Sequence, residues 1–304
     1  MSKILICIPT YNRNKSLINC LASIKKLRNN SLFKIEVLVM DNSITNDSSK
    51  IIKEFKKKND LKIYQNHEKK RGIVYARNKC LQFARKLKPN YIAFIDDDCT
   101  IDKNWLNNIF KLLSKIDADV ITGPQLYEGQ NKKNYTSLFE KKYKKKILRV
   151  NWAASNNVFF TFDILKREKN IKFDKNLNKF GMGEDQLFFS IINKIGYKIY
   201  WSKNIMVTEK IHLHRSSKNW VKERSKRLGI LGHYIDIKIH GKIIGYFVNY
   251  MKCFYLFFSS TIIYINIFNI NKDLDFANCL FRFYGKLIGP FYIKKIQFFK
   301  QKII

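Results

Sequence analysis

The chain has 304 residues, and its 58 Lys and Arg residues against 24 Asp and Glu residues give a formal net charge of +34. This length suits one catalytic domain with an appended region, and the charge suits nucleic acid, anionic lipid or a phosphate-rich ligand. No zinc-finger spacing, glycine-aromatic RNA-binding signature or basic region leading into a heptad zipper occurs, so no nucleic-acid partner is expected.

Strand-like and helix-like patterns alternate through the first 125 residues. Short apolar runs typical of buried strands occur at residues 4–8, 35–40, 61–64, 91–95 and 118–122. Between these runs, apolar residues recur every three or four positions, which is the spacing of a helix face. The alternation predicts an α/β fold with a mostly parallel central sheet, Rossmann-like and of a nucleotide-binding type. Neither GxGxxG nor GxxxxGK[ST] is present, which argues against a dinucleotide or P-loop site.

The second part of the chain is less regular. Residues 128–149 are rich in Lys, Asn and Tyr with little periodicity, which predicts a mobile loop. Order is expected again at 151–161, and the turn around Gly181 and Gly183 leads into a predicted helix. Short strands at 197–201 and 205–208 precede a basic helical stretch that begins at Ser217. We therefore predict a catalytic domain over residues 1–240, with halves at 1–125 and 126–240, and a helical region over 241–304.

Residues 253–271 form an uncharged run of 19 residues that is rich in Phe, Ile and Tyr. The run is long enough to span a bilayer, but its Asn and Ser residues weaken that interpretation. Lysines on either side favour a helix lying in the plane of an anionic membrane surface, and a buried core helix is the alternative. Scattered cysteines, and a strand expected to begin by Lys3, indicate a cytoplasmic protein without a secretory leader, peripheral or C-terminally anchored at the membrane.

Asp96, Asp97 and Asp98 directly follow the apolar run at 91–95. Hard divalent cations prefer carboxylate and phosphate oxygens, and ligands bind at the carboxyl ends of strands in open α/β sheets. These carboxylates therefore predict a Mn²⁺ or Mg²⁺ site that also holds substrate phosphates. We expect Asp98 to bind the cation directly, with Asp96 or Asp97 reaching the cation through water or reaching a ribose. A solvated acidic turn is the alternative.

Several motifs occur in the order found in glycosyltransferase family 2, which has the nucleotide-diphospho-sugar transferase (GT-A) fold. They are Ile8-Pro9-Thr10-Tyr11-Asn12-Arg13, Val39-Met40-Asp41-Asn42-Ser43, Arg71-Gly72 with Ala76-Arg77-Asn78, Phe94-Ile95-Asp96-Asp97-Asp98, and Gly183-Glu184-Asp185. The chain resembles this family over roughly residues 3–230. The resemblance implies an inverting glycosyltransferase that takes a UDP-, GDP- or dTDP-linked sugar and transfers it to a hydroxyl of a glycan or lipid-linked acceptor. Cell-surface polysaccharide or lipooligosaccharide biosynthesis is the implied setting.

The resemblance also assigns the donor site to residues in the first half of the chain. They are Pro9, Thr10, Tyr11, Arg13, Asp41, Arg71, Gly72, Arg77, Asp96 and Asp97. Tyr11 can stack on the base, and Asp41 can hydrogen-bond the base or ribose, or simply support a turn. Arg71 and Arg77 can neutralise phosphate charge or hold the aspartates in place.

Asp185 is the candidate general base, because an inverting transfer needs a carboxylate that takes the proton of the acceptor hydroxyl. Glu184 would orient that acceptor, and Trp152 and Asn156 are candidate acceptor contacts. Helix capping would also explain an acidic pair at a helix start, and Trp152 could instead fill the core. A third cation ligand stays open among Glu209, His212, His214 or none.

Two rival functions remain at this point. A polyprenyl-phosphate sugar synthase would use the same fold with a lipid phosphate as acceptor. A non-catalytic basic protein that binds membranes or nucleic acid would not need Asp185 together with the three consecutive aspartates.

Overall fold

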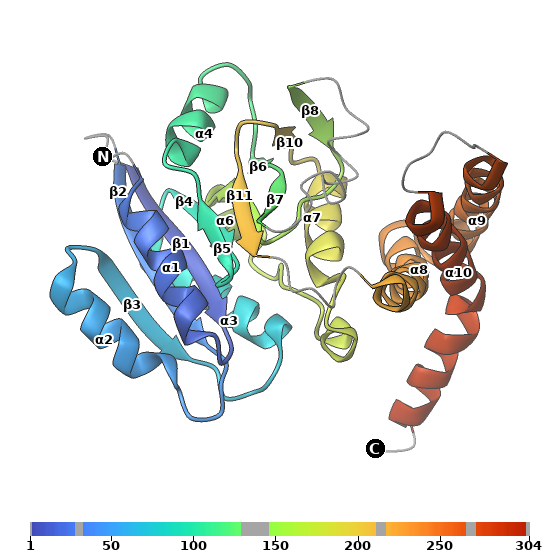
Figure 1. The fold of residues 1–304 in the computed structure, drawn as a ribbon, viewed down its shortest axis with the longest axis horizontal. Helices are drawn as coiled ribbons and strands as arrows, with labels where there is room; N and C mark the ends of the chain where they lie inside the picture. The colour runs from blue at the N-terminus through green and yellow to red at the C-terminus, as the bar shows by residue number, and fades with distance from the viewer. Residues whose placement is uncertain (1, 28–32, 129–145, 211–216, 266–271, 302–304) are drawn as a thin grey trace. The chain divides into compact units, whose positions relative to one another are not determined.

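The computed structural model describes residues 2–27, 33–128, 146–210, 217–265 and 272–301, and its contacts divide the chain into two compact units (Figure 1). The units are Met1–Lys210 and Ile211–Ile304. The predicted boundary after residue 240 differs from this division. The difference arises because the helix Lys218–His240 packs against the two helices that follow it.

The first unit begins with three strand–helix pairs and a fourth strand, as the alternation predicted. These elements are β1 (Ser2–Thr10), α1 (Asn14–Lys25), β2 (Phe33–Asp41), α2 (Ser48–Lys58), β3 (Lys62–His67), α3 (Ile73–Leu87) and β4 (Tyr91–Ile95). Strand β1 pairs in parallel with β2 on one side and with β4 on the other. Successive residues of β1 face opposite sides of the sheet, and both sides are covered by helices. Ile4 and Ile6 pack on one side with α1 and the helix Trp105–Leu113, whereas Leu5 and Cys7 pack on the other side with α3.

The unit continues with shorter elements, which extend the first sheet and form a second, smaller one. They are β5 (Cys99–Ile101), α4 (Trp105–Leu113), β6 (Val120–Thr122), β7 (Gln125–Glu128), β8 (Ile147–Val150), β9 (Asn157–Thr161), α6 (Asp163–Arg167), η1 (Lys175–Phe180), α7 (Glu184–Lys194), β10 (Ile199–Ser202) and β11 (Val207–Lys210). The eight-stranded sheet has the order β3-β2-β1-β4-β9-β6-β10-β8, and a three-stranded sheet has the order β5-β11-β7. The mostly parallel α/β prediction is confirmed, with β9 inserted antiparallel between β4 and β6.

One predicted loop is partly wrong. The ends of the stretch 128–149 belong to strands, because Glu128 closes β7 and residues 147–149 belong to β8. Strand β8 pairs antiparallel with β10, and this pairing supplies the backbone hydrogen bonds of β8. The lysine-rich sequence did not indicate the pairing. Residues 129–145 lie outside the described part of the chain.

The second unit consists of α8 (Lys218–His240), α9 (Lys242–Ile265) and α10 (Lys272–Gln301). Ser217 caps α8, because its hydroxyl oxygen accepts a hydrogen bond from the Trp220 amide. Within the described residues, none of the helices combines the length and the hydropathy needed to cross a bilayer.

Candidate active site

The three aspartates lie at the sheet edge where β1 and β4 both end. Because the two strands are parallel neighbours, Thr10 and the residues after β1 come close to the residues after β4. The Thr10 hydroxyl donates to Asp97 Oδ2 at 2.7 Å. Arg13 Nη1 lies 3.1 Å from Asp97 Oδ1 and 2.5 Å from Asp98 Oδ2. Both Thr10 and Arg13 were predicted to bind the donor, and here they hold the aspartates.

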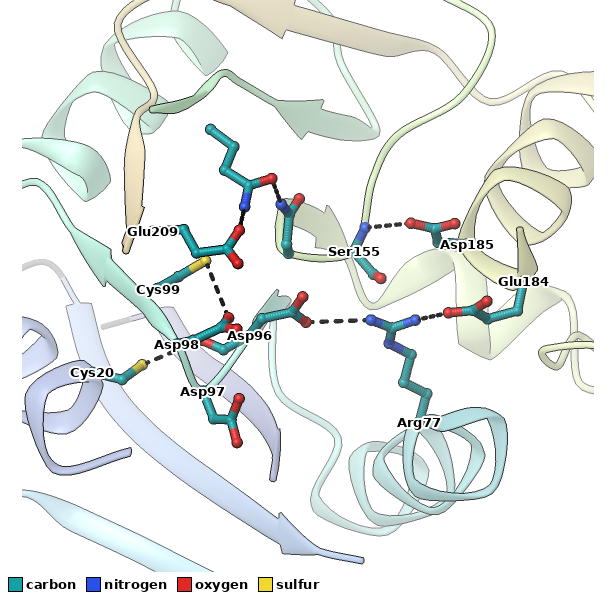
Figure 2. A network of polar contacts seen from close by, with 12 residues as sticks. Cys20, Arg77, Asp96, Asp97, Asp98, Cys99, Ser155, Glu184, Asp185 and Glu209 are labelled. Carbon is teal, nitrogen blue, oxygen red and sulfur yellow. Dashed lines mark hydrogen bonds and ion pairs between the residues drawn. The ribbon is translucent and has the colours of Figure 1, made fainter. Parts of the chain in front are cut away.

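Asp97 differs from its two neighbours. Its side chain is almost fully buried, and burial raises its pKa to about 6 although Thr10 and Arg13 oppose the shift. The side chains of Asp96 and Asp98 are 35% and 12% exposed. Figure 2 shows the Asp97 carboxylate directed away from the other two. Asp97 is thus a buried anchor, and Asp96 and Asp98 are the accessible carboxylates.

Arg77 joins the aspartates to the start of α7 (Figure 2). Its Nη2 lies 3.3 Å from Asp96 Oδ1, and its Nη1 donates to Glu184 Oε1. Arg77 and Glu184 are both buried. Burial alone would lower the pKa of Arg77, but the nearby carboxylates raise it, Glu184 most strongly. Two motifs far apart in the sequence therefore share one guanidinium group.

Asp185 lies beside this bridge at the first turn of α7. Gly181 and Gly183 precede the helix with φ angles of 64° and 84°, a left-handed conformation that favours glycine. Asp185 Oδ2 accepts a hydrogen bond from the Ser155 amide at 3.2 Å, and Oδ1 accepts one from the Gln186 amide at 2.7 Å. These two amides fix the direction of the carboxylate.

Three buried polar atoms near Asp185 have no hydrogen-bond partner among the described residues. They are Glu184 Oε2, Arg77 Nε and Ser155 Oγ. A buried polar atom without a partner is costly, and native proteins leave few of them. The cluster therefore offers both acceptors and donors to a polar ligand.

On the predicted donor side, Asp41 has a clear structural role. Its Oδ1 accepts from the Ser43 amide at 2.7 Å, and its Oδ2 accepts from the Ser48 amide at 2.8 Å. These bonds support the turn into α2, as the turn interpretation expected, and they lower the pKa of Asp41 although its burial opposes them. Each carboxylate oxygen has a second lone pair, so a contact with a nucleotide stays a prediction.

Arg71 and Gly72 are held close to Tyr11 and Asn42. The Arg71 guanidinium lies 5.3 Å from the centre of the Tyr11 ring. Asn42, which we did not predict, accepts from the Gly72 amide at 2.7 Å and donates to the carbonyl oxygens of Glu68 and Lys70. Pro9 is buried within β1. The Asn-Ser pair after Asp41 was the only sequence signal for this arrangement.

The predicted acceptor residues Trp152 and Asn156 have different surroundings: Trp152 packs against apolar residues, and Asn156 is hydrogen-bonded to a polar side chain. Trp152 is half-buried and packs against the core. Asn156 donates to Gln125, and Gln125 donates to Glu209. Glu209 in β11 pairs with Cys99 in β5, the residue after Asp98. Gln125 was missed because a single glutamine carries no pattern.

A cation fits part of this arrangement. Among the described residues, no group of three or more His, Cys, Asp or Glu side chains is placed to hold a metal ion by itself. His212 and His214 lie outside the described residues. Mg²⁺ and Mn²⁺ are, however, commonly bound by one or two carboxylates together with substrate phosphates. Asp98 and Asp96 supply such a partial set of hard oxygen ligands.

The chain is similar to known glycosyltransferases. The family model described as Glycosyl transferase family 2 matches residues 5–173, more than half of the chain. Poly(ribitol-phosphate) beta-N-acetylglucosaminyltransferase TarP of Staphylococcus aureus is 26% identical over 193 residues. That match covers 62% of this chain and 56% of TarP, so the chain spans little more than half the length of this relative.

Two solved structures share the fold. TarS 1-349 of Staphylococcus aureus in complex with UDP-GlcNAc has a TM-score of 0.56 and 17% identity, covering 92% of this chain and 80% of that chain. Mannosyltransferase PcManGT from Pyrobaculum calidifontis, in complex with GDP-Man and Mn²⁺, has a TM-score of 0.62 and 14% identity, covering 94% and 86%. At these identities the likeness is one of fold.

Proposed function

Because the chain belongs to glycosyl transferase family 2, we propose that it transfers a sugar from a nucleotide-diphosphate donor to a hydroxyl of a glycan or lipid-linked acceptor. The nucleotide sugars named for TarS and PcManGT support the donor class. The poly(ribitol-phosphate) in the name of TarP supports a hydroxyl-bearing polymer as acceptor, and we propose cell-surface polysaccharide or lipooligosaccharide biosynthesis as the setting. We further propose that the transfer inverts the anomeric configuration and takes place at the cytoplasmic face of the membrane.

One observation carries this proposal. Arg77 contacts both Asp96 at the end of β4 and Glu184 at the start of α7. If Glu184 and Asp185 only capped α7, no connection to the three aspartates would be required. If the aspartates were only a solvated turn, no connection to α7 would be required. A transferase needs both, since the diphosphate and the acceptor must meet at the anomeric carbon.

We assign the donor to the side of the site formed by Tyr11, Asp41 and Arg71. The Arg71 guanidinium beside the Tyr11 ring gives a cationic and aromatic surface suited to a nucleotide. Asp98 and Asp96 would hold Mn²⁺ or Mg²⁺ next to the diphosphate. When bound, the cation supplies Lewis-acid stabilisation of the negative charge on the leaving diphosphate.

On the acceptor side, we assign proton removal to Asp185. The Ser155 and Gln186 amides hold its carboxylate in one orientation, as a base positioned for proton transfer requires. The unpartnered Glu184 Oε2 and Ser155 Oγ are suited to hydrogen-bond acceptor hydroxyls. Asn156 and Trp152 would extend this contact.

The test is a screen of UDP-, GDP- and dTDP-linked sugars for protection against thermal unfolding, with and without Mn²⁺. A ligand at a hundredfold excess over its Kd stabilises the native state by about 2.7 kcal/mol. We expect at least one donor to protect the protein more strongly with Mn²⁺ than without it.

Asp98→Asn should abolish the Mn²⁺-dependent part of this protection, because it removes a charged ligand but little volume. Asp117→Asn is the matched control, since the Asp117 side chain is 83% exposed and pairs with Lys198 at the surface. Unchanged Mn²⁺-dependent donor affinity in Asp98→Asn would refute the cation assignment.

A further inference from the structure

Helix α9 has its apolar and polar faces reversed relative to a helix of a water-soluble protein. The residues buried against the other helices are small or polar, namely Gly245, Asn249, Cys253 and Ser260. The large apolar residues are exposed instead: Ile243, Ile244, Phe247, Tyr250, Met251, Phe254, Tyr255, Phe257, Phe258, Ile262, Tyr264 and Ile265. Amphipathic helices of soluble proteins turn the apolar stripe toward the core.

The exposed residues of α9 form one continuous surface. At 100° per residue, the buried positions cluster around one direction and the exposed apolar positions around the opposite one. Phe247, Phe254 and Phe258 lie near the centre of the apolar surface and are 66%, 60% and 61% exposed. Large contiguous apolar patches are rare on soluble monomers and mark interaction sites.

The interior of the three-helix unit contains a buried polar cluster beside apolar residues such as Leu231 and Ile235. Asp236 is buried and accepts from Lys286 Nζ at 3.0 Å and from Lys252 Nζ at 2.5 Å. Lys286 also donates to Asn249 Oδ1 at 3.1 Å, and the Asn249 amide donates back to the Lys286 carbonyl at 3.3 Å. Ionisable residues that face the inside of a bundle and pair with one another are typical of helices in lipid.

Glycines bring the backbones of these helices together. A Cβ at Gly285 of α10 would lie 2.1 Å from the Lys226 carbonyl oxygen of α8, and one at Gly229 would lie 2.3 Å from that of Arg282. Small residues at helix contacts allow this close approach, and they are enriched where apolar burial does not drive association.

The unit also carries positive charge. Helix α8 contains six Lys and Arg residues against Glu223 and Asp236, and α9 contains Lys242 and Lys252 with no acidic residue. Arg224, Arg227 and Lys238 of α8 are exposed. This charge is complementary to anionic headgroups, whose attraction contributes near the membrane surface.

We propose that the helical unit 217–301 docks on an anionic lipid surface, with the exposed apolar face of α9 in the headgroup and acyl boundary and α9 parallel to the membrane plane. A second copy of this chain could cover the apolar face, but the surplus of basic residues would repel another copy and attract anionic lipid. The inference does not depend on the sugar chemistry, so the two proposals can fail separately.

The experiment measures flotation of the full-length protein, freed of dialysable detergent, with vesicles of phosphatidylcholine alone or mixed with phosphatidylglycerol. We expect binding to the mixed vesicles that weakens in high salt. Phe254→Ser/Phe258→Ser should lower that binding by roughly tenfold or more, because it removes apolar surface from the centre of the face. Both side chains are exposed, so the variant should keep the thermal midpoint of the parent.

The control is Ile18→Ser/Ile195→Ser, which removes two exposed apolar residues of the other unit and should bind vesicles like the parent. Light scattering of the lipid-free protein tests the second copy as partner. Absence of vesicle binding by the parent, equal binding by parent and the Phe variant, or a stable dimer that only the Phe variant dissociates would each overturn the proposal.

Discussion

Arg77 is the residue on which the geometry of the site depends most. It is buried between Asp96 and Glu184, and its removal would leave buried carboxylate charge without a partner. Breaking a buried ion pair in this way is strongly destabilising. We expect Arg77→Met to lower the free energy of unfolding by about 3 to 5 kcal/mol, measured by denaturant titration.

Arg13→Met is the comparison for this prediction. Arg13 also contacts two carboxylates, those of Asp97 and Asp98, but its side chain is 42% exposed. Exposed pairs contribute only about 0 to 1 kcal/mol, but Asp97 is buried, so this variant should lose some stability and clearly less than Arg77→Met, because the Arg77 guanidinium group is itself buried. Equal losses in the two variants would show that the Arg77 bridge has no special structural role.

At the residue scale, the sequence indicated which residues gather but not how they pair. Asp96 and Asp98 were selected because carboxylates at the end of a buried strand suit a divalent cation, and Glu184 and Asp185 because of the family resemblance. The role of Asn42 between three backbone groups could not be read from the sequence, because it depends on the loop 68–72 returning to the end of β2.

His233 gives a prediction at the scale of the helical unit. It is buried in α8 against Tyr246, with the charged groups of Lys286 and Asp236 nearby. Burial, with Lys286, lowers its pKa from 6.5 to about 4. Between these values the unfolded chain binds a proton that the folded chain does not, so this residue makes stability fall as the pH falls from 6.5 to 4.

His233→Phe should therefore lose less stability than the parent over this pH range, because Phe has no proton to bind. The measurement is the thermal midpoint of the full chain at several pH values by circular dichroism. Parallel curves for parent and variant would contradict the assigned shift, whatever the difference in absolute stability.

At the element scale, periodicity predicted the strands and helices of residues 1–125 and the start of α7. The predicted boundary after residue 240 differs from the division after Lys210, because the sequence of α8 does not show that this helix packs against the two helices that follow it. Its buried positions are Gly229, His233, Tyr234 and Asp236 among others, and only the partners α9 and α10 explain that choice.

At the scale of the whole molecule, the basic residues behind the net charge of +34 have different roles in the two units. In the first unit, Arg13 and Arg77 neutralise carboxylates of the site. In the second unit, exposed basic residues of α8 accompany the exposed apolar surface of α9. The uncharged run after Cys253 signalled an unusual helix, but its sequence could not show that the polar residues face inward and the phenylalanines outward.

The central claim is that this site transfers a sugar with Asp185 as the base. The most direct test is the rate of nucleoside diphosphate release by the parent and by Asp185→Asn, at saturating concentrations of the donor found in the binding screen. Asn keeps the shape and its carbonyl oxygen can still accept one of the two amide hydrogen bonds, but its NH2 group cannot accept the other and the side chain cannot take the proton. We predict unchanged donor affinity and a rate lower by about 10² to 10⁴-fold. A rate within about threefold of the parent would show that Asp185 only caps α7 and would contradict this assignment of the catalytic base.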